Sequence, residues 1–405
     1  MTPPRLSRRD FSLAFGGTLA LAASALSQRH SVDLTTPEAP GTIHINFNEN
    51  PYGPTPKALA ALATCGHIAA RYPDRSEGSL TAAIAKMHGV QAENIALGCG
   101  STEILHVVDL TFVGPGKNVV AAEPTFEAVL EYAQALHANA VKVPLTADYR
   151  HDLPRMAAQC TSKTGVVYIC NPNNPTGTIV SRREIAEFLP QVPTTTLVLV
   201  DEAYHHFVED PAYQSSVDLI GQYPNLVVAR TFSKIYGLAG MRLGYGVGSK
   251  ETIAQMNPEM LIANGNAAVV AAATASLSDQ DAVAATRTKL NATRAWLCEE
   301  MKKDGRAYIP SQANFVMIDM GSDVKPIVAK FKEQKILVGR PFQSMPTFLR
   351  VSIGTQPEME TFVATLREIS PRRDEGEIER EIPPLRGCAC GTSRDTRGKT
   401  VMAPG

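Results

Sequence analysis

Short apolar runs alternate with amphipathic stretches through the middle of the chain. The clearest runs are rich in β-branched residues and end in polar or glycine-rich turns: 164–170 (TGVVYIC), 195–200 (TTLVLV) and 225–231 (NLVVART). Because nearly every position in them is apolar, they predict strands buried on both faces, as in a parallel sheet covered by helices. Between them, SRREIAEFL predicts a helix with a capping box formed by Ser181 and Glu184. The alternation predicts an α/β fold.

A second, smaller region follows an alanine-rich segment at 266–277 and a charged helical stretch at 279–303. It contains two further strand signals, ANFVMIDM and FLRVSIG, with a predicted helix at 324–334 between them. This order indicates a smaller α+β unit. From Pro371 onward the chain has no aromatic residue and is dense in Arg, Glu, Pro and Gly, so we predict a disordered tail over 371–405.

The overall composition narrows the class of function. The chain has 405 residues, which favours two packed units, and its 39 basic residues are balanced by 40 acidic ones. That balance lacks the basic excess of a nucleic-acid binder and favours an enzyme of small molecules, with neither a nucleic-acid nor a membrane partner. The seven cysteines are mostly scattered, and the close pair Cys388 and Cys390 has no second pair to complete a zinc site. We therefore expect no metal.

The composition of the N-terminus differs from that of the rest of the chain. Arg8 and Arg9 precede an apolar run from Ser12 to Leu26, which is too short for a typical membrane-spanning helix. The pattern predicts a twin-arginine export signal over residues 1–30 and a periplasmic location, or a cytoplasmic one where the signal is not used. The other reading, an amphipathic helix, is disfavoured because the run is apolar on every face.

Polar residues directly follow each of the three apolar runs. Asn174 lies in the first following segment, Asp201 and Tyr204 in the second, and Ser233 and Lys234 in the third. Ligands of open α/β sheets bind outside the carboxyl ends of the strands. We therefore expect these side chains to converge at one edge of the sheet. Core packing does not explain why polar residues gather there, so they indicate a ligand site.

A glycine-rich turn, LGCGSTEIL, predicts an anion site. Gly100 permits close backbone approach, and Ser101 and Thr102 open an apolar helix whose free N–H groups suit a phosphate. An ordinary helix cap is the other reading of the same residues. Neither a Walker-type loop nor a dinucleotide-binding glycine motif is present in the sequence. His205 and His206 are adjacent and so lack the spacing of a helical zinc pair.

Four motifs in order, NPNNPTG, DEAY, TFSKIYGLAGMRLGY and LRVSIGT, resemble the class I/II aminotransferases of the aspartate aminotransferase fold. FNENPYGP, RYPD and GSTEIL place the resemblance in the histidinol-phosphate aminotransferase branch, over about 43–369. The resemblance implies the PLP-dependent transferase fold of type I, with a large, mostly parallel sheet flanked by helices and a smaller α+β domain. We assign an N-terminal arm to 31–75, serving the small domain and the dimer, the large cofactor-binding domain to 76–278 and the small domain to 279–370.

The resemblance also implies pyridoxal 5'-phosphate as the cofactor. Lys234 matches the lysine that holds it covalently, and Arg242 matches the arginine that pairs with its phosphate. Further phosphate contacts would come from Thr231, Ser233 and the turn Gly100, Ser101 and Thr102. Tyr72 matches a tyrosine that reaches the phosphate in the neighbouring subunit, which implies a homodimer with shared active sites.

Other matched residues would contact the cofactor ring. Asp201 matches the residue facing the pyridine nitrogen, where a carboxylate keeps the nitrogen protonated. Tyr204 and Asn174 match residues that hydrogen-bond the ring hydroxyl. Phe126 falls where an aromatic side chain stacks on the ring, and a core phenylalanine is the equal alternative. The implied catalytic residues are Lys234, as acid and base, with Asp201 and Tyr204.

Substrate recognition is implied for a further set of residues. Arg350 matches the arginine that binds the α-carboxylate. Arg340 resembles the arginine that binds the phosphate of histidinol phosphate, although Gly339 interrupts the usual apolar run before it; it would otherwise serve a dicarboxylate or the entrance of the site. Asn50 and Asn314 are pocket candidates with a structural role as the alternative.

The implied reaction moves an amino group from an amino acid or amine-like donor to a 2-oxo acid such as 2-oxoglutarate, with histidinol phosphate as the best candidate donor. Three alternatives remain. One is an aminotransferase for aromatic or other amino acids, and another is a PLP-dependent decarboxylase or lyase, which needs no oxo-acid acceptor. The third is a PLP-sensing regulator, for which the chain lacks a basic DNA-binding segment.

Overall fold

A computed structural model describes residues 39–371 of the chain. The elements below lie in the unit that begins at Ile43. The predicted export signal over 1–30, the tail from 372 and the pair Cys388 and Cys390 lie outside the described residues. Within residues 39–371, no helix has both the length and the apolar character needed to cross a membrane.

The largest sheet has seven strands in the order β2-β8-β7-β6-β5-β3-β4. The strands are β2 (Ile95–Gly98), β3 (Asn118–Glu123), β4 (Asn139–Pro144), β5 (Thr164–Cys170), β6 (Leu197–Asp201), β7 (Leu226–Thr231) and β8 (Gly244–Gly248). From β4 through β3, β5 and β6 to β7 every pair is parallel, and β8 is antiparallel to both of its neighbours. The three predicted apolar runs are therefore adjacent strands, which confirms the mostly parallel sheet.

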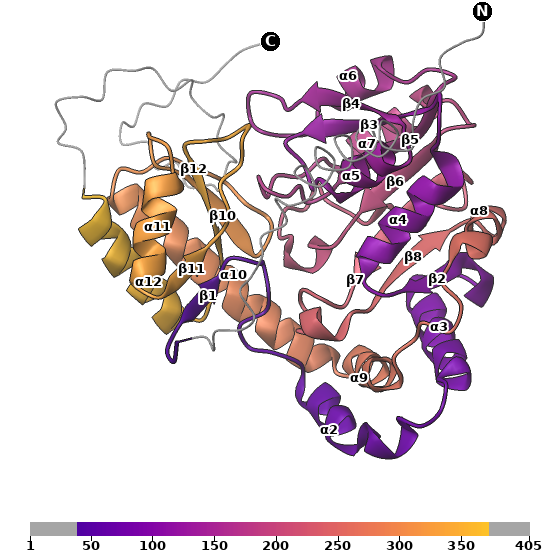
Figure 1. The fold of residues 1–405 in the computed structure, drawn as a ribbon, viewed down its shortest axis with the longest axis horizontal. Coiled ribbons are helices and arrows are strands. Elements are labelled where there is room, and N and C mark those ends of the chain that lie inside the picture. The colour runs from indigo at the N-terminus through magenta and orange to yellow at the C-terminus, as the bar shows by residue number, and fades with distance from the viewer. Residues whose placement is uncertain (1–38, 372–405) are drawn as a thin grey trace, which may run out of the picture. The chain divides into compact units, whose positions relative to one another are not determined.

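Both faces of this sheet are covered (Figure 1). Alternate residues of β6 enter two separate apolar clusters, Val198 and Val200 in one and Leu197 and Leu199 in the other. One face packs against α4 (Ser101–Phe112), α5 (Ala128–Ala135) and α8 (Lys250–Met256). The other packs against α3 (Asp74–His88), α6 (Leu153–Ala158), α7 (Arg182–Phe188) and α9 (Ala267–Leu277), while α2 (Pro56–Thr64) lies against α9. Burial on both faces explains why the strand runs lack polar positions.

The second region is built on a small antiparallel sheet in the order β12-β10-β9. Its strands are β9 (Tyr308–Ile309), β10 (Phe315–Asp319) and β12 (Phe348–Ser352), and its helices are α10 (Gln280–Lys303), α11 (Lys325–Glu333) and α12 (Gln356–Ile369). A separate pair joins β1 (Ile43–Ile45) in parallel to β11 (Ile336–Val338). This region confirms the predicted α+β character, while the exact domain boundaries stay a prediction.

Local signals in the sequence account for several element ends. The Ser181 hydroxyl accepts from Glu184 N at 3.2 Å, and the Glu184 carboxylate accepts from Ser181 N at 2.7 Å, which confirms the predicted capping box. Asn266 caps α9 in the same way, with its side chain accepting from Ala268 N. Short 3₁₀ turns connect the longer elements: η1 (Cys65–Ile68), η2 (Ala92–Asn94), η3 (Leu189–Gln191), η4 (His205–Phe207), η5 (Ser216–Leu219), η6 (Ala239–Met241) and η7 (Asn257–Glu259).

Candidate active site

The ends of β5, β6 and β7 bring the predicted polar residues to one edge of the sheet. Asn171 N, just past β5, donates to Asp201 O at 2.9 Å, and Glu202 N, just past β6, donates to Ala229 O at 2.9 Å. These bonds continue the ladder beyond the strand ends and fix the loops that follow. Asp201 closes β6, and Lys234 lies three residues beyond the end of β7. The expected convergence at this edge is confirmed.

Asp201 is a buried carboxylate with only 3% of its surface exposed. Its oxygens accept from the Tyr168 hydroxyl at 3.0 Å and from Ala203 N at 3.1 Å. Burial raises its pKa to about 6, and the two hydrogen bonds and the charge of Lys234 act against that rise. A buried carboxylate of this kind is stabilised by a cation placed against it.

Lys234 projects into the same space. Its Nζ donates to the carbonyl oxygen of Phe47 at 3.1 Å and lies 5.6 Å from the centre of the Tyr204 ring. Burial, followed by the nearby guanidinium of Arg350, lowers the pKa of Lys234 to about 8, while Asp201 acts in the opposite direction. The amine is therefore closer to its neutral, nucleophilic form than a surface lysine would be.

Tyr204 is held beside the lysine by a residue that the sequence reasoning missed. The Tyr204 hydroxyl accepts from Asn48 Nδ2 at 3.1 Å, and the Ser352 hydroxyl donates to Asn48 Oδ1 at 2.9 Å. Asn48 has a positive φ of 56°, a conformation that asparagine tolerates better than most residues. Burial raises the pKa of Tyr204, so its hydroxyl keeps its proton. Asn48 belongs to the FNENPYGP motif, which was the signal available for it.

A cradle of hydrogen-bond donors lies at the start of α4. Gly100 has φ of 79°, and a Cβ there would lie 2.3 Å from a terminal nitrogen of Arg242, so only glycine lets the guanidinium pass this close. Arg242 donates to the Ser233 hydroxyl at 3.2 Å, and the Thr231 hydroxyl donates to Ser233 Oγ at 2.9 Å. Ser101 and Thr102 are the first two residues of α4, which has 12 residues. The backbone N–H groups of its first turn have no partner within the helix. A helix start, four hydroxyl groups and a guanidinium suit a phosphate dianion.

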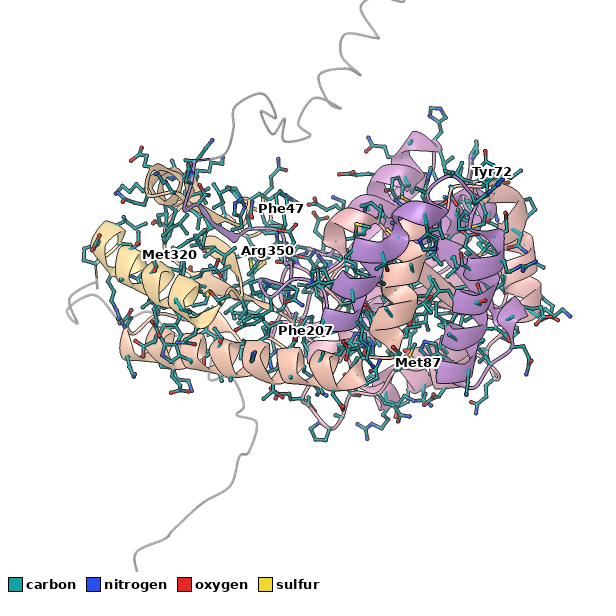
Figure 2. All side chains as sticks on the ribbon, turned by 90° about the horizontal axis from the view of Figure 1, so that it is seen from below. Phe47, Tyr72, Met87, Phe207, Met320 and Arg350 are labelled. Atoms are coloured by element: carbon teal, nitrogen blue, oxygen red, sulfur yellow. The ribbon has the colours of Figure 1, made fainter. Side chains whose placement is uncertain are left out.

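Arg350 is a buried cation whose charge acts on Lys234. It donates to Asn174 Oδ1 at 2.7 Å and to the carbonyl oxygen of Asn46 at 2.8 Å, and its buried Nε has no hydrogen-bond partner. Its Cζ lies 5.4 Å from the centre of the Phe342 ring. Burial lowers the pKa of Arg350 to about 10. Arg350, labelled in Figure 2, has only 8% of its surface exposed, so its free donor is available to an anion that enters this buried position.

The remaining predicted residues lie nearer the surface or are already engaged. Arg340 forms an ion pair with Glu127, and neighbouring Phe126 is 36% exposed. The Asn50 amide donates to Ile235 O at 2.9 Å and so braces the loop after Lys234. The Asn314 amide donates to Asn48 O at 3.1 Å, and its Oδ1 has no partner. For Asn50 and Asn314, these contacts favour the structural alternative.

Tyr72 lies away from these residues within a single chain. It precedes α3, has 77% of its surface exposed and stands at the edge of the described structure in Figure 2. A Cβ at Gly265 would meet the Pro73 ring at 3.1 Å, so the segment that carries Leu261, Ile262 and Gly265 touches the chain just after Tyr72 at Gly265. Those two residues are 67% and 96% exposed. The segment therefore presents apolar surface outward.

Behind the site, a buried ion pair joins the ends of β6 and β7. Arg230 donates to Glu202 at 3.0 Å and to the Ser215 hydroxyl at 2.7 Å, and both charged side chains are almost fully buried. His205 contacts both Arg230 and His206, and burial lowers the pKa of each histidine. Burial, followed by the charge of Arg230, therefore favours the neutral form of both histidines. In residues 39–371 no group of His, Cys, Asp and Glu side chains is arranged to hold a metal.

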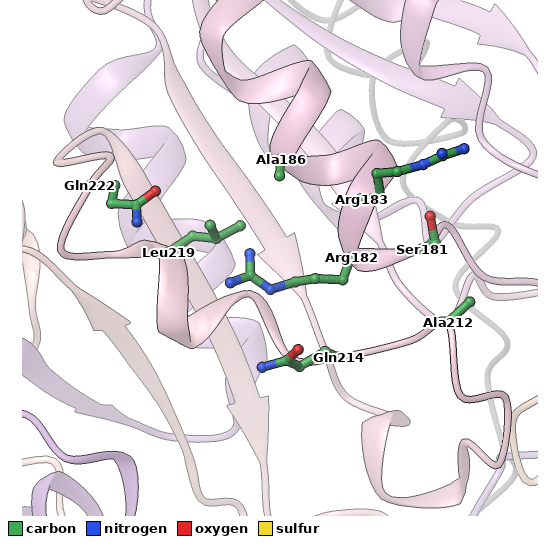
Figure 3. Close-up of a pocket in the computed structure, with 8 residues that line it drawn as sticks. All are labelled: Ser181, Arg182, Arg183, Ala186, Ala212, Gln214, Leu219 and Gln222. Carbon is green, nitrogen blue, oxygen red and sulfur yellow. The ribbon is translucent and has the colours of Figure 1, made fainter.

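A separate surface hollow of about 650 Å³ lies between α7 and η5. It is lined by residues that include Arg182, Gln214 and Gln222, and Figure 3 shows their side chains around it. None of the predicted site residues contributes to it. The convergence of polar groups at the sheet edge, rather than this hollow, marks the candidate site.

Comparisons with known proteins agree with this geometry. Residues 40–366 match the model of the family described as aminotransferase class I and II. A histidinol-phosphate aminotransferase of Moorella thermoacetica is 40% identical, covering 81% of this chain and 85% of that protein. One from Brevibacillus brevis is 37% identical, covering 81% and 90%.

A solved structure is similar over the same length. It is a histidinol-phosphate aminotransferase from Sinorhizobium meliloti in complex with pyridoxal-5'-phosphate. It has a TM-score of 0.77 and 30% identity to this chain, and the match covers 81% of this chain and 90% of that one. The resemblance drawn from the motifs is confirmed: the chain belongs to the class I and II aminotransferase family.

Proposed function

We propose that this protein is a pyridoxal 5'-phosphate-dependent aminotransferase that moves an amino group from an amino acid or amine-like donor to a 2-oxo acid. The observation that supports this proposal most strongly is that Lys234, Asp201 and the cradle around Arg242 meet at one edge of the large sheet. Family membership and the names of the similar proteins support the same activity. The similar Sinorhizobium protein binds pyridoxal-5'-phosphate, which supports this cofactor.

The residues present fit that cofactor at both of its polar ends. Arg242, Ser233 and the Gly100 turn supply donors for the phosphate. Asp201 supplies a buried carboxylate whose pKa is raised by burial. A protonated ring nitrogen beside it would neutralise its charge and so favour its ionised form. When bound, the cofactor accepts electrons from the substrate carbon that loses its proton.

Lys234 acts as the acid and base at that carbon. A pKa lowered to about 8 lets the amine take up and return a proton near neutral pH. Tyr204, fixed by Asn48 at 3.1 Å, holds a protonated hydroxyl beside the amine and orients whatever occupies the site. Asp201 does not move, because Tyr168 and Ala203 N hold both of its oxygens.

Arg350 binds the α-carboxylate shared by amino-acid donors and 2-oxo acids. Its free Nε and its burial against Phe342 provide an anion site in which water is largely excluded. Asn174 and the carbonyl oxygen of Asn46 hold the two terminal nitrogens at 2.7 and 2.8 Å, and Nε stays without a partner. The same residue therefore serves every half-reaction whose substrate carries an α-carboxylate, and for histidinol phosphate the phosphate ester takes that place.

The donor with the best support is histidinol phosphate or a compound like it. The similar proteins carry that name, and Arg340, with 41% of its side chain exposed, offers a cation for an anionic group of the substrate. An aromatic amino-acid donor would need no such cation. A decarboxylase or lyase on the same fold would turn over without a 2-oxo acid, so a requirement for the acceptor separates the two chemistries.

The working unit is a homodimer in which Tyr72 completes the partner's phosphate site. Its 77% exposure, together with the exposure of the apolar Leu261 and Ile262, supports a role outside its own chain. Mixing Lys234→Ala chains with Tyr72→Ala chains should restore about a quarter of wild-type activity, because random pairing makes half of the dimers mixed and each mixed dimer has one intact site. Mixtures no more active than either variant alone would refute the shared site.

Export by the twin-arginine route is proposed for the N-terminal segment. The motif with Arg8 and Arg9 supports it. Residues 1–30 fused to a reporter should carry it to the periplasm, and Arg8→Lys with Arg9→Lys should keep it in the cytoplasm. A reporter retained in the cytoplasm with the native arginines would refute export.

A panel of donors and acceptors tests the activity. The purified, PLP-loaded protein should transfer an amino group from histidinol phosphate to 2-oxoglutarate and show no product when the acceptor is left out. Glutamate formation, followed by chromatography, gives the readout for every donor in the panel. Product formation without any 2-oxo acid would replace the aminotransferase with a lyase or decarboxylase.

A further inference from the structure

The cation expected to bind a substrate's side-chain anion already has a protein partner. Arg340 forms an ion pair with Glu127, a residue 213 positions away in sequence. Their side chains are 41% and 48% exposed, so the pair stands at the rim of the site. The resemblance gives Glu127 no role.

Gly339 brings this pair next to the carboxylate site. Gly339 N donates to Arg350 O at 2.9 Å, and a Cβ at position 339 would lie 2.6 Å from that oxygen. Glycine is therefore needed for the close approach that places Arg340 beside Arg350. This explains the departure from the usual apolar run before Arg340.

The two arginines share an aromatic neighbour. The Cζ of Arg340 lies 4.6 Å from the centre of the Phe342 ring, and the Cζ of Arg350 lies 5.4 Å from it. The charges of Arg340 and Glu127 both act on the pKa of Arg350, in opposite directions and after the larger effect of burial. Glu127 also directly follows Phe126, the residue expected to stack on the cofactor ring. The pair is thus close enough to meet the far end of a bound substrate.

An exposed ion pair of this kind is easily exchanged. Such pairs contribute about 0 to 1 kcal/mol, so a substrate anion can replace the Glu127 carboxylate at little cost. A substrate with a neutral side chain offers Arg340 nothing and leaves the pair intact. The arginine would then stay neutralised instead of facing an apolar group as an unpaired cation.

We propose that Glu127 is a specificity-determining residue that holds Arg340 when the substrate side chain is neutral and releases it to a terminal anionic group. The anionic group is the second carboxylate of a dicarboxylate such as 2-oxoglutarate. This inference rests on the proposed aminotransferase function, because it assumes that Arg350 anchors the substrate's α-carboxylate. It lets one pocket accept both acidic and uncharged side chains in successive half-reactions.

The test compares Glu127→Gln with Glu131→Gln in the PLP-loaded protein. Glu131 is exposed on the same helix, one turn after Glu127, so its variant removes the same charge without touching the pair. Calorimetry with glutarate and with hexanoate compares ligands with and without a second carboxylate.

Glu127→Gln should tighten glutarate binding about two- to five-fold, the range that an exposed ion pair allows. It should leave the binding of hexanoate unchanged. Glu131→Gln should change none of them. In an Arg340→Gln background, the effect of Glu127→Gln should vanish, because no cation remains for which the Glu127 carboxylate and the ligand could compete.

Two results would overturn the inference: equal changes for anionic and neutral ligands, or no gain for glutarate in Glu127→Gln. Equal changes would mean that Glu127 only supports the fold of the loop. Because glutarate binding needs no turnover, it separates this inference from the activity. A protein with the predicted glutarate shift and no amino transfer would refute the proposed function and support the role of Glu127.

Discussion

The floor and the rim of the site are built in different ways. At the floor, Asp201 and Tyr204 are 3% and 4% exposed, and backbone bonds between strand ends fix the loops that carry them. At the rim, Arg340 and Glu127 are 41% and 48% exposed and contact each other instead of the sheet. The floor is rigid and suits chemistry common to all substrates, whereas the rim can exchange partners and suits the choice among them.

The strongest test of the floor is Asp201→Asn. The amide keeps the size and loses the charge that would hold a ring nitrogen protonated, so kcat should fall about 10²- to 10³-fold for every substrate. Tyr168→Phe, which removes one donor to Asp201 and keeps its charge, should cost far less. Steady-state rates with several donors give the comparison. A loss of kcat confined to substrates with anionic side chains would mean that Asp201 selects among substrates, as proposed for the rim residues, and would contradict its role in the common chemistry.

The same carboxylate should destabilise the protein without its cofactor. Its pKa is about 6 in the fold and 3.8 in the reference state, so the penalty appears as pH rises above about 4 and levels off above about 6. Cofactor-free Asp201→Asn should therefore be more stable than the wild type by up to about 3 kcal/mol at pH 7. Urea unfolding at pH 4 and pH 7 measures this difference. An equal difference at both pH values would contradict the buried charge.

Between floor and rim, Arg350→Lys should weaken every substrate. Lysine keeps the charge and loses the planar fork, so kcat/KM should fall about 10- to 100-fold whatever the side chain. Initial rates with histidinol phosphate and with an aromatic donor would check this. A loss for only one of the two donors would mean that Arg350 reads the side chain.

The smallest effect is expected at the rim. Arg340→Gln removes one exposed charge, so kcat/KM should fall about two- to ten-fold for 2-oxoglutarate and stay unchanged for a neutral 2-oxo acid. Single-turnover kinetics with the two acceptors would measure the ratio. A loss as large and general as that of Asp201→Asn would erase the distinction between the two regions.

The floor could be predicted from the sequence because its signals are local. The apolar runs that became β5, β6 and β7 carry Asn174, Asp201 and Lys234 at or just beyond their ends. Parallel strands bring such ends together whatever the rest of the fold does. The capping box at Ser181 and the smaller α+β region were predicted for the same reason, since each depends on neighbouring residues.

The partners of these residues could not be predicted in the same way. Asn48 contacts Tyr204 across 156 positions, and Glu127 contacts Arg340 across 213. In the sequence, Tyr168 looks like any other core residue of a buried strand, although its hydroxyl donates to Asp201. Contacts of this length depend on loop conformation, which a pattern of apolar residues does not specify. The role proposed for Tyr72 would further depend on a second chain.

The central claim is that Lys234 holds the cofactor covalently, and borohydride trapping tests it most directly. The PLP-loaded protein would be reduced, digested and analysed by mass spectrometry, with Lys234→Ala treated alongside. We predict one phosphopyridoxyl label, on the peptide that contains Lys234, and an inactive variant without the label. A label on another lysine, or full activity in Lys234→Ala, would contradict the account.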